Sequence, residues 1–477
     1  MTDRAALDVD RKARLKIPRQ PFPKQDPKVR IHNWDEVYLP IDLEVAKVEA
    51  TRCIQCPAAP CMKACPVNND IPGAFWKLEQ GDIVGAAEIF YETSNLPEMC
   101  GRLCPQERLC EGDCVVGKNA PPVAIGRLEA FVADHYRANG GYDVKSRPKP
   151  TGRKVAIVGA GPAGLAAAEE LAKAGHAITV FDAWPEPGGI LLYGIPNFKM
   201  EKDVLDAKIE YLRKLGVEFT MSTSIGYDVS IDDLFERGYH AVFLAHGASE
   251  GNKLDLPGAD LPGIMIATEF LVRGNVPPNQ LPESMREPLI VGDHVVVIGG
   301  GDTSMDCVRT AVRLGASEVT CAYRRTEAEQ TGRMEERIHA KEEGVRFEYL
   351  VSPLRFEAGS DGRIARVHFA TMMLSDPDES GRRRPLPTGE AFVVAADTVV
   401  IAVGYRADEG VAADAGVERD QDLVLIDRET GRTSRPGVFA GGDCVNGADL
   451  VVTAIADGRR AATAIHTYLT KESEAAA

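Results

Sequence analysis

A glycine-rich segment between an apolar run and a helix-forming run constrains the fold of this 477-residue chain more than any other feature. Residues 155–158 (VAIV) are typical of a buried parallel strand, and residues 165–173 are helix-forming. Three glycines at GxGxxG spacing connect these runs: Gly159, Gly161 and Gly164. Such glycines allow a tight turn, a close approach of backbone to a pyrophosphate, and close packing of helix on strand. The segment therefore predicts a Rossmann-like fold that binds a dinucleotide.

The residues after this segment support the same interpretation. A second apolar run, residues 177–181, ends at Asp182, where an acidic side chain can bind a ribose hydroxyl. The glycine-containing loop at 186–196 would let backbone approach a flat ring, and a plain glycine-rich loop is the alternative. The first fold thus has the strand, helix, second strand and acid that dinucleotide binding requires.

A segment late in the chain completes this first fold. A strand-like run at 438–440 and a helix-forming run from about residue 450 to 469 flank Gly442 and Asp443. We expect Asp443 to bond a ribityl hydroxyl and the start of the helix to face a flavin. The alternative is that Asp443 only caps a helix.

A second segment repeats the fingerprint. Apolar residues 295–298 follow His294 and lead into two glycines and a serine at the fingerprint positions: Gly299, Gly301 and Ser304. A helix over 305–314 and a strand over 318–323 are expected to follow. The pattern predicts a second nucleotide-binding fold, with serine in place of the third glycine.

The second fold ends its second strand in Arg324 and Arg325, where the first fold has an acid. An acid at this position accepts a ribose hydroxyl, whereas arginines suit a 2′-phosphate. The pair therefore favours NADPH over NADH. Two solvated arginines at a strand end are the alternative.

Cysteines are concentrated ahead of the first fingerprint. Eight of the eleven fall into two groups of short spacing, Cys53, Cys56, Cys61 and Cys65, then Cys100, Cys104, Cys110 and Cys114. Helical runs at 41–51, 71–91 and 124–135 surround them, and an extended arm of about 40 residues precedes them. In a cytosolic chain such a cluster indicates metal rather than disulfides.

Two sets of four thiolates suit two [4Fe–4S] clusters, each of which needs four ligands on loops that can wrap a cube. Two structural zinc sites and free thiols are the alternatives, but the short spacings lack the long separation typical of such zinc sites. The other three cysteines, Cys307, Cys321 and Cys444, are expected to be small buried apolar residues.

Composition excludes other classes. The net charge of −16 disfavours nucleic acid and anionic membrane as partners. No apolar run approaches the roughly 18 residues of a membrane helix, and the first 30 residues have no apolar signal-like core. We expect a cytoplasmic protein.

The two fingerprints form an internal repeat. Residues 398–404 (TVVIAVG) parallel residues 241–247 (AVFLAHG), and we interpret these stretches as the crossings between domains. The expected fold is α/β: an N-terminal helical iron–sulfur domain, then two Rossmann-like three-layer domains, the second inserted in the first. The expected boundaries are 1–150 for the helical domain and arm, 151–285 with 398–477 for the first nucleotide domain, and 286–397 for the second.

Together the motifs resemble the small (beta) subunit of glutamate synthase and its relatives over about residues 30–470. The resemblance is carried by CIQCPAAPCMKACPV, CGRLCPQERLCEGDC, VAIVGAGPAGLAAAEEL, GGILLYGIPNFK, VVVIGGGDTSMDCVRTAVRLGA and GVFAGGDCVNGADLVVTAIADGR. Relatives include the large subunit of NADH-dependent ferredoxin:NADP oxidoreductase and the N-terminal half of dihydropyrimidine dehydrogenase. GGGDTSMDCVRTAVRLGA is most similar to glutamate synthase, whereas PVAIGRLEAF is more similar to the ferredoxin:NADP branch.

The resemblance implies an NADPH-dependent FAD and iron–sulfur oxidoreductase. It would pass a hydride from NADPH to FAD, and then single electrons through two clusters to a partner. In glutamate synthase the partner is a large FMN and iron–sulfur subunit that converts L-glutamine and 2-oxoglutarate to two L-glutamate; another electron-accepting subunit is the alternative. Hydride transfer needs stacking and electrostatic tuning, so we expect no catalytic proton carrier.

The expected cofactor contacts fall into two sets. Those of the first fold and its late completion are Gly159, Gly161, Pro162, Ala163, Gly164, Asp182, Gly188, Gly189, Leu191, Tyr193, Gly194, Ile195, Gly247, Gly442, Asp443, Leu450 and Val451. Those of the second fold are Gly299, Gly301, Asp302, Thr303, Ser304, Arg324, Arg325 and Gly404.

The cysteines are expected to bind in a crossed arrangement. In two-cluster ferredoxins the fourth cysteine of a run ending in Cys-Pro, as at Cys65, ligates the other cluster, and the related dihydropyrimidine dehydrogenase fold interleaves its ligands. One cluster would then bind Cys53, Cys56, Cys61 and Cys114, and the other Cys65, Cys100, Cys104 and Cys110. One cluster per cysteine group is the alternative.

Overall fold

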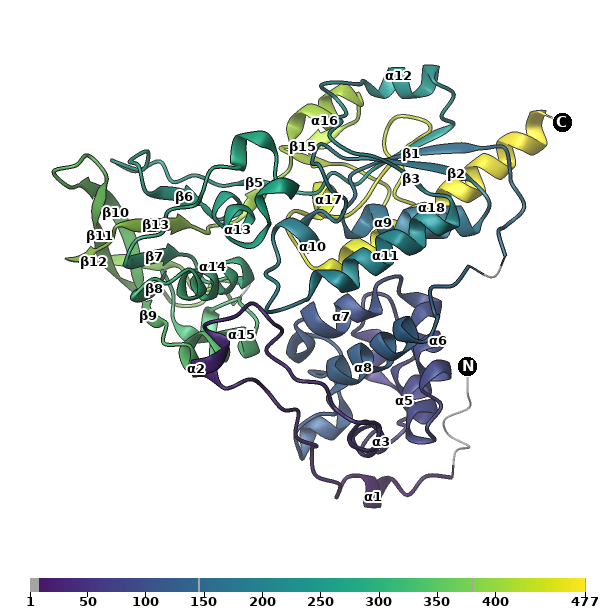
Figure 1. Ribbon diagram of the computed structural model, residues 1–477, viewed down its shortest axis with the longest axis horizontal. Coiled ribbons are helices and arrows are strands. Elements are labelled where there is room, and N and C mark those ends of the chain that lie inside the picture. The colour runs from purple at the N-terminus through teal and green to yellow at the C-terminus, as the bar shows by residue number, and fades with distance from the viewer. Residues whose placement is uncertain (1–7, 145, 380, 477) are drawn as a thin grey trace.

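The computed structural model describes residues 8–144, 146–379 and 381–476. It consists of a helical domain and two α/β domains (Figure 1), which confirms the expected fold class. The first seven residues of the expected arm and residue 145, before the first strand, lie outside the described residues. No described helix is both long enough and apolar enough to cross a membrane.

The helical domain holds all eight clustered cysteines. Asp42, Asp70 and Asp82 each accept a hydrogen bond from a backbone N–H one turn on, which caps the start of three of its helices. Its elements are α3 (Leu43–Thr51), α4 (Pro60–Lys63), α5 (Ile71–Glu79), α6 (Ile83–Thr93), α7 (Pro97–Leu103), η1 (Gln106–Arg108), η2 (Val115–Lys118) and α8 (Ile125–Ala138). The helical runs expected from sequence are therefore present, with the predicted break at Gly81, where φ is +86°.

The first α/β domain is built on a five-stranded parallel sheet in the order β17-β4-β1-β2-β3. Its strands are β1 (Lys154–Val158), β2 (Ala177–Phe181), β3 (Glu218–Thr220), β4 (Ala241–Leu244) and β17 (Val438–Ala440), with a small ladder of β15 (Arg419–Asp420) and β16 (Leu423–Val424). Its helices are α9 (Pro162–Lys173), α10 (Ile190–Tyr193), α11 (Lys202–Leu215), α12 (Ile231–Glu236), α16 (Glu409–Asp414), α17 (Asp443–Asn446) and α18 (Val451–Ala476). The late segment thus completes this sheet, as the sequence predicted.

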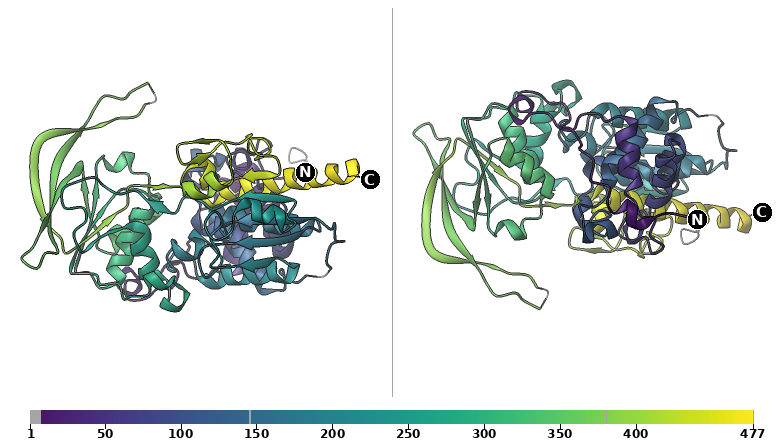
Figure 2. Two further views of the ribbon diagram at one scale, coloured as in Figure 1. Left: turned by 90° about the horizontal axis from the view of Figure 1, so that it is seen from above. Right: turned by 90° about the horizontal axis from the view of Figure 1, so that it is seen from below.

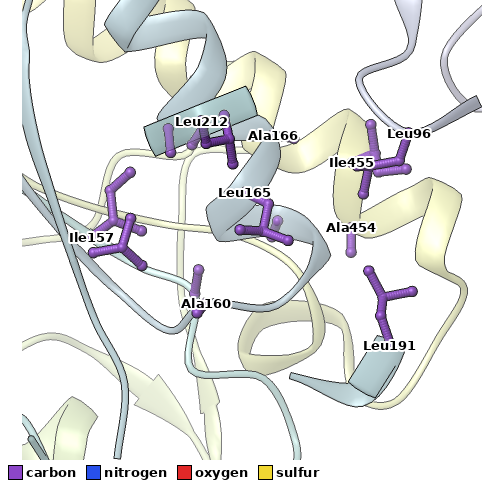
Figure 3. Close-up of a cluster of buried hydrophobic side chains, with 14 of the residues drawn as sticks. Leu96, Ile157, Ala160, Leu165, Ala166, Leu191, Leu212, Ala454 and Ile455 are labelled. Carbon is purple, nitrogen blue, oxygen red and sulfur yellow. The ribbon is translucent and has the colours of Figure 1, made fainter. Parts of the chain in front are cut away.

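Helices α9, α11 and α18 lie between this sheet and the helical domain (Figure 1). Figure 3 shows part of the buried cluster they form, in which Leu96 of the helical domain lies beside Ile455 of α18. The same cluster contains Ile157 of β1, Leu165 of α9 and Cys100. One continuous apolar core therefore joins the first nucleotide fold to the cysteine domain.

The second α/β domain has a five-stranded parallel sheet in the order β6-β13-β7-β8-β9. Its strands are β6 (Ile264–Ile266), β7 (His294–Ile298), β8 (Glu318–Tyr323), β9 (Arg346–Tyr349) and β13 (Thr398–Ile401), and its helical elements are α13 (Ala267–Asn275), η3 (Pro278–Gln280), η4 (Glu283–Met285), α14 (Asp302–Arg313), η5 (Glu327–Glu329) and α15 (Met334–Glu342). An unpredicted antiparallel sheet stands at the far end of the molecule (Figure 2): β10 (Val351–Ala358), β11 (Ile364–Leu374) and β12 (Pro385–Ala395).

The expected boundaries at 285/286 and 397/398 are wrong. Strands β6 and β13 lie in the second sheet, although the sequence interpretation gave both to the first domain. The reason is the repeat itself, because β13 pairs with β7 in the way that β4 pairs with β1. The chain crosses between the domains at β5 (Glu250–Gly251), before β6, and at β14 (Tyr405–Arg406), after β13, and these two strands pair antiparallel.

The N-terminal arm connects two domains. It contains two single-turn helices, α1 (Arg11–Arg14) and α2 (Pro27–Arg30). Lys24 and Tyr38 form an isolated antiparallel β-bridge. In Figure 1 the arm leaves the helical domain near α1, reaches the second α/β domain at α2 and returns to α3. The expected extended arm is thus a packed strap.

A buried ion pair lies where the helical domain meets the first α/β domain. Glu169 of α9 and Lys208 of α11 are 2.5 Å apart, and their side chains are 2% and 0% exposed. Burial alone would raise the pKa of Glu169, but Lys208 and Lys173 lower it to about 2, so the carboxylate is charged at neutral pH. The Lys208 ammonium also lies about 5 Å from the rings of Tyr142 and Tyr211.

Removing one partner of this pair should destabilise the junction. Glu169→Ala leaves a buried ammonium without its carboxylate, and such losses cost about 3–5 kcal/mol. Lys173→Ala is the matched control, because Lys173 also pairs with Glu169 but is 44% exposed. Chemical denaturation should show that the free energy of unfolding falls by several kcal/mol, about 3–5, in Glu169→Ala. In Lys173→Ala it should change by less than about 1 kcal/mol. Equal midpoints for both variants would show that the pair is not important for stability.

Candidate cofactor sites

A cavity of about 1070 Å³ lies between the two α/β domains, and residues of both fingerprints line it. The predicted contacts that line it are Gly159, Gly161, Pro162, Ala163, Asp182, Gly189, Tyr193, Gly194, Ile195, Gly247, Gly299, Gly301, Asp302, Thr303, Arg324, Arg325, Gly404, Gly442, Asp443, Leu450 and Val451. The structure therefore brings both sequence motifs and the late segment to one site.

The two fingerprint turns have the same construction. Gly159 has φ +109°, and a Cβ there would lie 2.2 Å from the carbonyl oxygen of Ala245. Gly299 has φ +148°, and a Cβ there would lie 2.2 Å from the carbonyl oxygen of Ala402. Only glycine meets both demands, so each turn is held against the strand beside it.

The second glycine of each fingerprint leaves open space at the cavity wall. A Cβ at Gly161 would have no atom within 4 Å, and at Gly301 only the Thr331 hydroxyl, at 3.7 Å. Each glycine is the N-cap of its helix and has no side-chain cap. The free space and the uncapped N–H groups together fit a phosphate at each helix start.

The acid of the first fold is held in place by backbone. Asp182 accepts hydrogen bonds from the N–H groups of Ala160 (2.8 Å) and Trp184 (2.9 Å). Burial raises the pKa of Asp182, while these two hydrogen bonds act in the opposite direction. Its carboxylate is thus fixed at the cavity wall, where a ribose would lie.

Asp443 does not cap a helix through its side chain. The N-cap of α17 is Gly442, and no side-chain cap hydrogen bond forms there. The turn is held instead by Asp457 of α18, which accepts hydrogen bonds from Gly442 N (2.9 Å) and Asn446 Nδ2 (2.7 Å). Asp443 lines the cavity; burial raises its pKa to about 6, although a hydrogen bond from the Asp449 backbone acts in the opposite direction.

The two arginines of the second fold lie at the cavity wall beside residues 351–353. Among the residues that the structure describes, neither guanidinium forms an ion pair, and the Nε of Arg325 is buried without a hydrogen-bond partner. Arginines paired within the protein would have no free donors, so these two are suited to an anionic ligand.

Four predicted contacts do not line the cavity: Gly164, Gly188, Leu191 and Ser304. A Cβ at Gly164 would lie 2.0 Å from the carbonyl oxygen of Gly159, so this glycine lets the helix pack on the turn. Leu191 is part of the buried core, and Ser304 is buried behind the Gly299 turn. These residues shape the wall from behind.

Other residues of the cavity were not predicted. His246 is half-buried, but both of its ring nitrogens are buried without partners, and desolvation lowers its pKa to about 4. Trp184 and Lys199 line the wall from the first α/β domain, and Leu103 and Arg108 line it from the helical domain. The sequence signal for His246 was its place between Ala245 and Gly247 after β4; the others depend on how the domains pack.

A second, small cavity lies within the helical domain. Cys65, Cys100, Cys104 and Cys110 line it together with Glu129 of α8. Glu129 is buried, accepts a hydrogen bond from Asn69 (3.1 Å), and has a pKa raised by burial. Sequence reasoning missed this carboxylate, which is a fifth possible donor beside four thiols.

The remaining four cysteines form a second set. Burial raises the pKa of Cys61, and charges on Cys53, Cys56 and Cys114 raise it further, so these sulfurs lie within electrostatic reach of one another. The two sets adjoin, because Cys110 interacts with both Cys65 and Cys61. The crossed arrangement requires these two groupings, and its assignment of ligands to clusters stays a prediction.

Within the described residues, no group of three or more His, Cys, Asp or Glu side chains is close enough together to hold a single metal ion.

Two consecutive residues line the two different cavities. Val451, at the start of α18, lines the large cavity, and Val452 lines the cysteine cavity. Both belong to the core that contains Cys100 and Ala163 or pack against it. A ligand at the start of α18 would therefore lie close to the four cysteines of the small cavity, Cys65, Cys100, Cys104 and Cys110.

Comparison with known proteins agrees with this arrangement. Residues 30–141 match the family model described as dihydropyrimidine dehydrogenase domain II, 4Fe-4S cluster, and residues 153–458 match pyridine nucleotide-disulphide oxidoreductase. The glutamate synthase [NADPH] small chain of Escherichia coli K12 is 42% identical over 455 residues, 94% of this chain and 96% of that one. The chain belongs to the glutamate synthase small-chain family. It is an oxidoreductase with a 4Fe-4S domain, and the resemblance inferred from sequence is confirmed.

Other members and neighbours have different names. The oxidoreductase AegA of E. coli K12 is also 42% identical, over 93% of this chain and 68% of its own length. FprA from Mycobacterium tuberculosis in complex with NADPH has a TM-score of 0.59 at 23% identity, over 69% of this chain and 86% of that one. The latter similarity shows the fold of the two α/β domains.

Substitution of single cysteines should separate the crossed and sequential arrangements. In the crossed arrangement Cys114→Ala disturbs the same EPR signal as Cys53→Ala, and Cys65→Ala the same signal as Cys104→Ala, because each pair would share a cluster. Cys444→Ala is the control. Cys444 is buried in the first α/β domain, so its substitution should leave both signals unchanged. If Cys114 instead groups with Cys104, and Cys65 with Cys53, the sequential arrangement holds.

Proposed function

We propose that this chain is the electron-input subunit of an NADPH-type glutamate synthase. It would oxidise NADPH with FAD as the first acceptor and send single electrons through two [4Fe–4S] clusters to a large FMN and iron–sulfur subunit. That subunit would convert L-glutamine and 2-oxoglutarate to two L-glutamate. The observation that carries the proposal is the shared cavity, which is lined by both fingerprints and meets the cysteine cavity at Val451 and Val452.

The first fold supplies the FAD site. The open space at Gly161 and the start of α9 suit the pyrophosphate, and Asp182 suits the adenosine ribose. Asp443 and the start of α18 face the other end of the cavity, next to the helical domain. When bound, FAD supplies the step between two-electron hydride chemistry and one-electron transfer.

The second fold supplies the NADPH site. Its uncapped helix start at Gly301 suits the pyrophosphate, and Arg324 and Arg325 suit the 2′-phosphate. Both nucleotides would enter one cavity from opposite domains, so their rings meet between the fingerprints. The chain then has only to hold them in register and exclude water.

The cysteines supply the route out. The set beside Val452 is next to the FAD cavity, and the set of Cys53, Cys56, Cys61 and Cys114 adjoins it on the far side. Electrons would pass through the two sets in this order.

A specific observation supports a second candidate for the partner. AegA matches this chain at the same identity as the small chain, and the NADP(+)-dependent formate dehydrogenase subunit beta of Moorella thermoacetica is 38% identical over 86% of this chain. The same input module is therefore present in proteins of other names. The alternative function is to feed another electron-accepting protein, such as a ferredoxin-linked oxidoreductase.

Coenzyme choice tests the role of the arginine pair. Replacing Arg324 and Arg325 with glutamine should raise KM for NADPH tenfold or more and change KM for NADH little, because each charge-assisted hydrogen bond contributes about 1.5–3 kcal/mol. Arg346→Gln is the control, since Arg346 lies on the next strand and pairs with Glu318 at the surface. An unchanged preference between the coenzymes would contradict the assignment.

The partner is tested by reconstitution. Co-expression with the large subunit of a glutamate synthase from the same source should yield a complex that forms glutamate from L-glutamine and 2-oxoglutarate with NADPH. The control omits 2-oxoglutarate. A chain that oxidises NADPH with an artificial acceptor, but neither binds this subunit nor supports glutamate formation, would favour the second candidate.

A further inference from the structure

The second α/β domain and the N-terminal arm both contact the side chain of Phe198 in the first α/β domain. Phe198 follows the cavity residues Gly194 and Ile195 in the first α/β domain and is 1% exposed. The guanidinium groups of Arg309 and Arg313, both on α14 of the second α/β domain, lie 4.3 and 4.0 Å from its ring centroid. Trp34 of the N-terminal arm stacks on the same ring at 6.2 Å.

A buried charge cluster encloses this ring. The carboxylate of Glu343, just after α15, accepts hydrogen bonds from Arg30 of the arm (2.7 Å), Arg309 (2.8 Å) and Arg313 (2.8 Å). Arg30 also pairs with Glu342 at 2.7 Å. The side chains of Arg30, Arg309 and Glu343 are at most 1% exposed. Arginine suits such a buried, multiply bonded site because its planar group presents five fixed donors.

The cluster is ionised at physiological pH. Burial by itself raises the pKa of Glu343, but hydrogen bonds and charge from Arg309 and Arg313 outweigh it and lower the pKa to about 2. Its stabilising contribution is therefore fully present above the usual carboxylate pKa and is lost only as the pH falls towards 2. The Glu343 carboxylate is therefore charged under working conditions.

The cluster lies directly behind the wall of the large cavity. Lys199, next to Phe198, pairs with Asp306 at 2.8 Å, and both side chains line the cavity. Asp306, Arg309 and Arg313 are spaced along one face of α14, the helix that begins at the second fingerprint. One helix face thus contacts the first α/β domain near the cavity and the arm farther out.

We propose that this cluster of Arg30, Arg309, Arg313 and Glu343 around Phe198 is a clasp, by which the N-terminal arm fixes the second nucleotide domain against the first for hydride transfer. Arg30 is then a positioning residue that touches neither nucleotide. The inference rests on the proposed function, because it assumes that NADPH and FAD meet in the shared cavity.

The connection between the domains explains why a clasp is needed. The two α/β domains are joined by the crossings at β5 and β14, which pair over two residues each. Hydride transfer needs reacting atoms about 3–3.5 Å apart, and a misplacement of about 1 Å costs on the order of 100-fold in rate. The arm adds further ties: Asn33 O accepts a hydrogen bond from Arg313 (3.1 Å), and Trp34 O accepts one from Asn197 (3.1 Å).

The experiment is anaerobic stopped-flow reduction of the FAD-loaded, iron-loaded chain by NADPH. Arg30→Met should slow the limiting rate of flavin bleaching at saturating NADPH by 10- to 100-fold, with the Kd for NADPH changed less than twofold. Arg435→Met is the matched control, since Arg435 also pairs with a carboxylate, Asp232, and lies over a ring, Phe235, but within one domain. It should keep the rate within twofold of wild type.

Each result decides the matter. A limiting rate for Arg30→Met within twofold of wild type overturns the clasp, and so does a change in Kd alone. If Arg30→Met cannot be loaded with FAD, then Arg30→Lys and Phe198→Leu, which keep the charge and the apolar volume respectively, take the same measurement, and wild-type rates in both overturn it. If NADPH does not reduce the flavin bound to the wild-type chain, the proposed function itself is contradicted.

Discussion

The contact that the rest of the structure depends on is between backbone and backbone. In each α/β domain the first fingerprint glycine lies against the carbonyl at the end of the neighbouring strand, Ala245 for Gly159 and Ala402 for Gly299. A side chain at either glycine would clash, so the turn, the strand beside it and the start of the helix hold one geometry. This geometry directs both helix starts to the same cavity.

A second close contact sets the position of the cysteines. A Cβ at Gly458 of α18 would lie 2.2 Å from the carbonyl oxygen of Ala163, so the glycine lets α18 pack closely on the start of α9. The opposite side of α18 packs on α7 of the helical domain through one apolar core. The order of sites from nucleotide cavity to cysteine cavity is therefore a result of helix packing, and Val451 and Val452 face the two sides.

Local pattern was sufficient to predict much of this. The strand–glycine–helix units, the break at Gly81 and the completion of the first sheet by residues 438–440 depend on short-range rules. The domain boundaries were wrong because the sequence of β13 would suit either sheet. Only its pairing with β7 shows to which sheet it belongs. The antiparallel sheet of β10, β11 and β12 was missed for a similar reason, since its strands are partly exposed and lack a fingerprint.

Contacts between distant segments were beyond the sequence. Glu129 lines the cysteine cavity from α8, a helix whose sequence has no metal-binding motif. Arg30 donates to Glu343, which lies more than 300 residues later in the chain. No periodicity reports such pairs, because they follow from how whole domains dock. The sequence therefore predicted most of the side chains that line the large cavity as candidate contacts, and the structure adds which distant segments hold that cavity together.

X-ray anomalous scattering at the iron and zinc edges, on crystals of the anaerobically purified chain, tests the central claim most directly. The account predicts flavin density in the large cavity and two iron clusters, one of them bounded by Cys65, Cys104 and Cys110 on the far side of Val452. Zinc at the cysteines, or iron with no flavin beside it, would contradict the account.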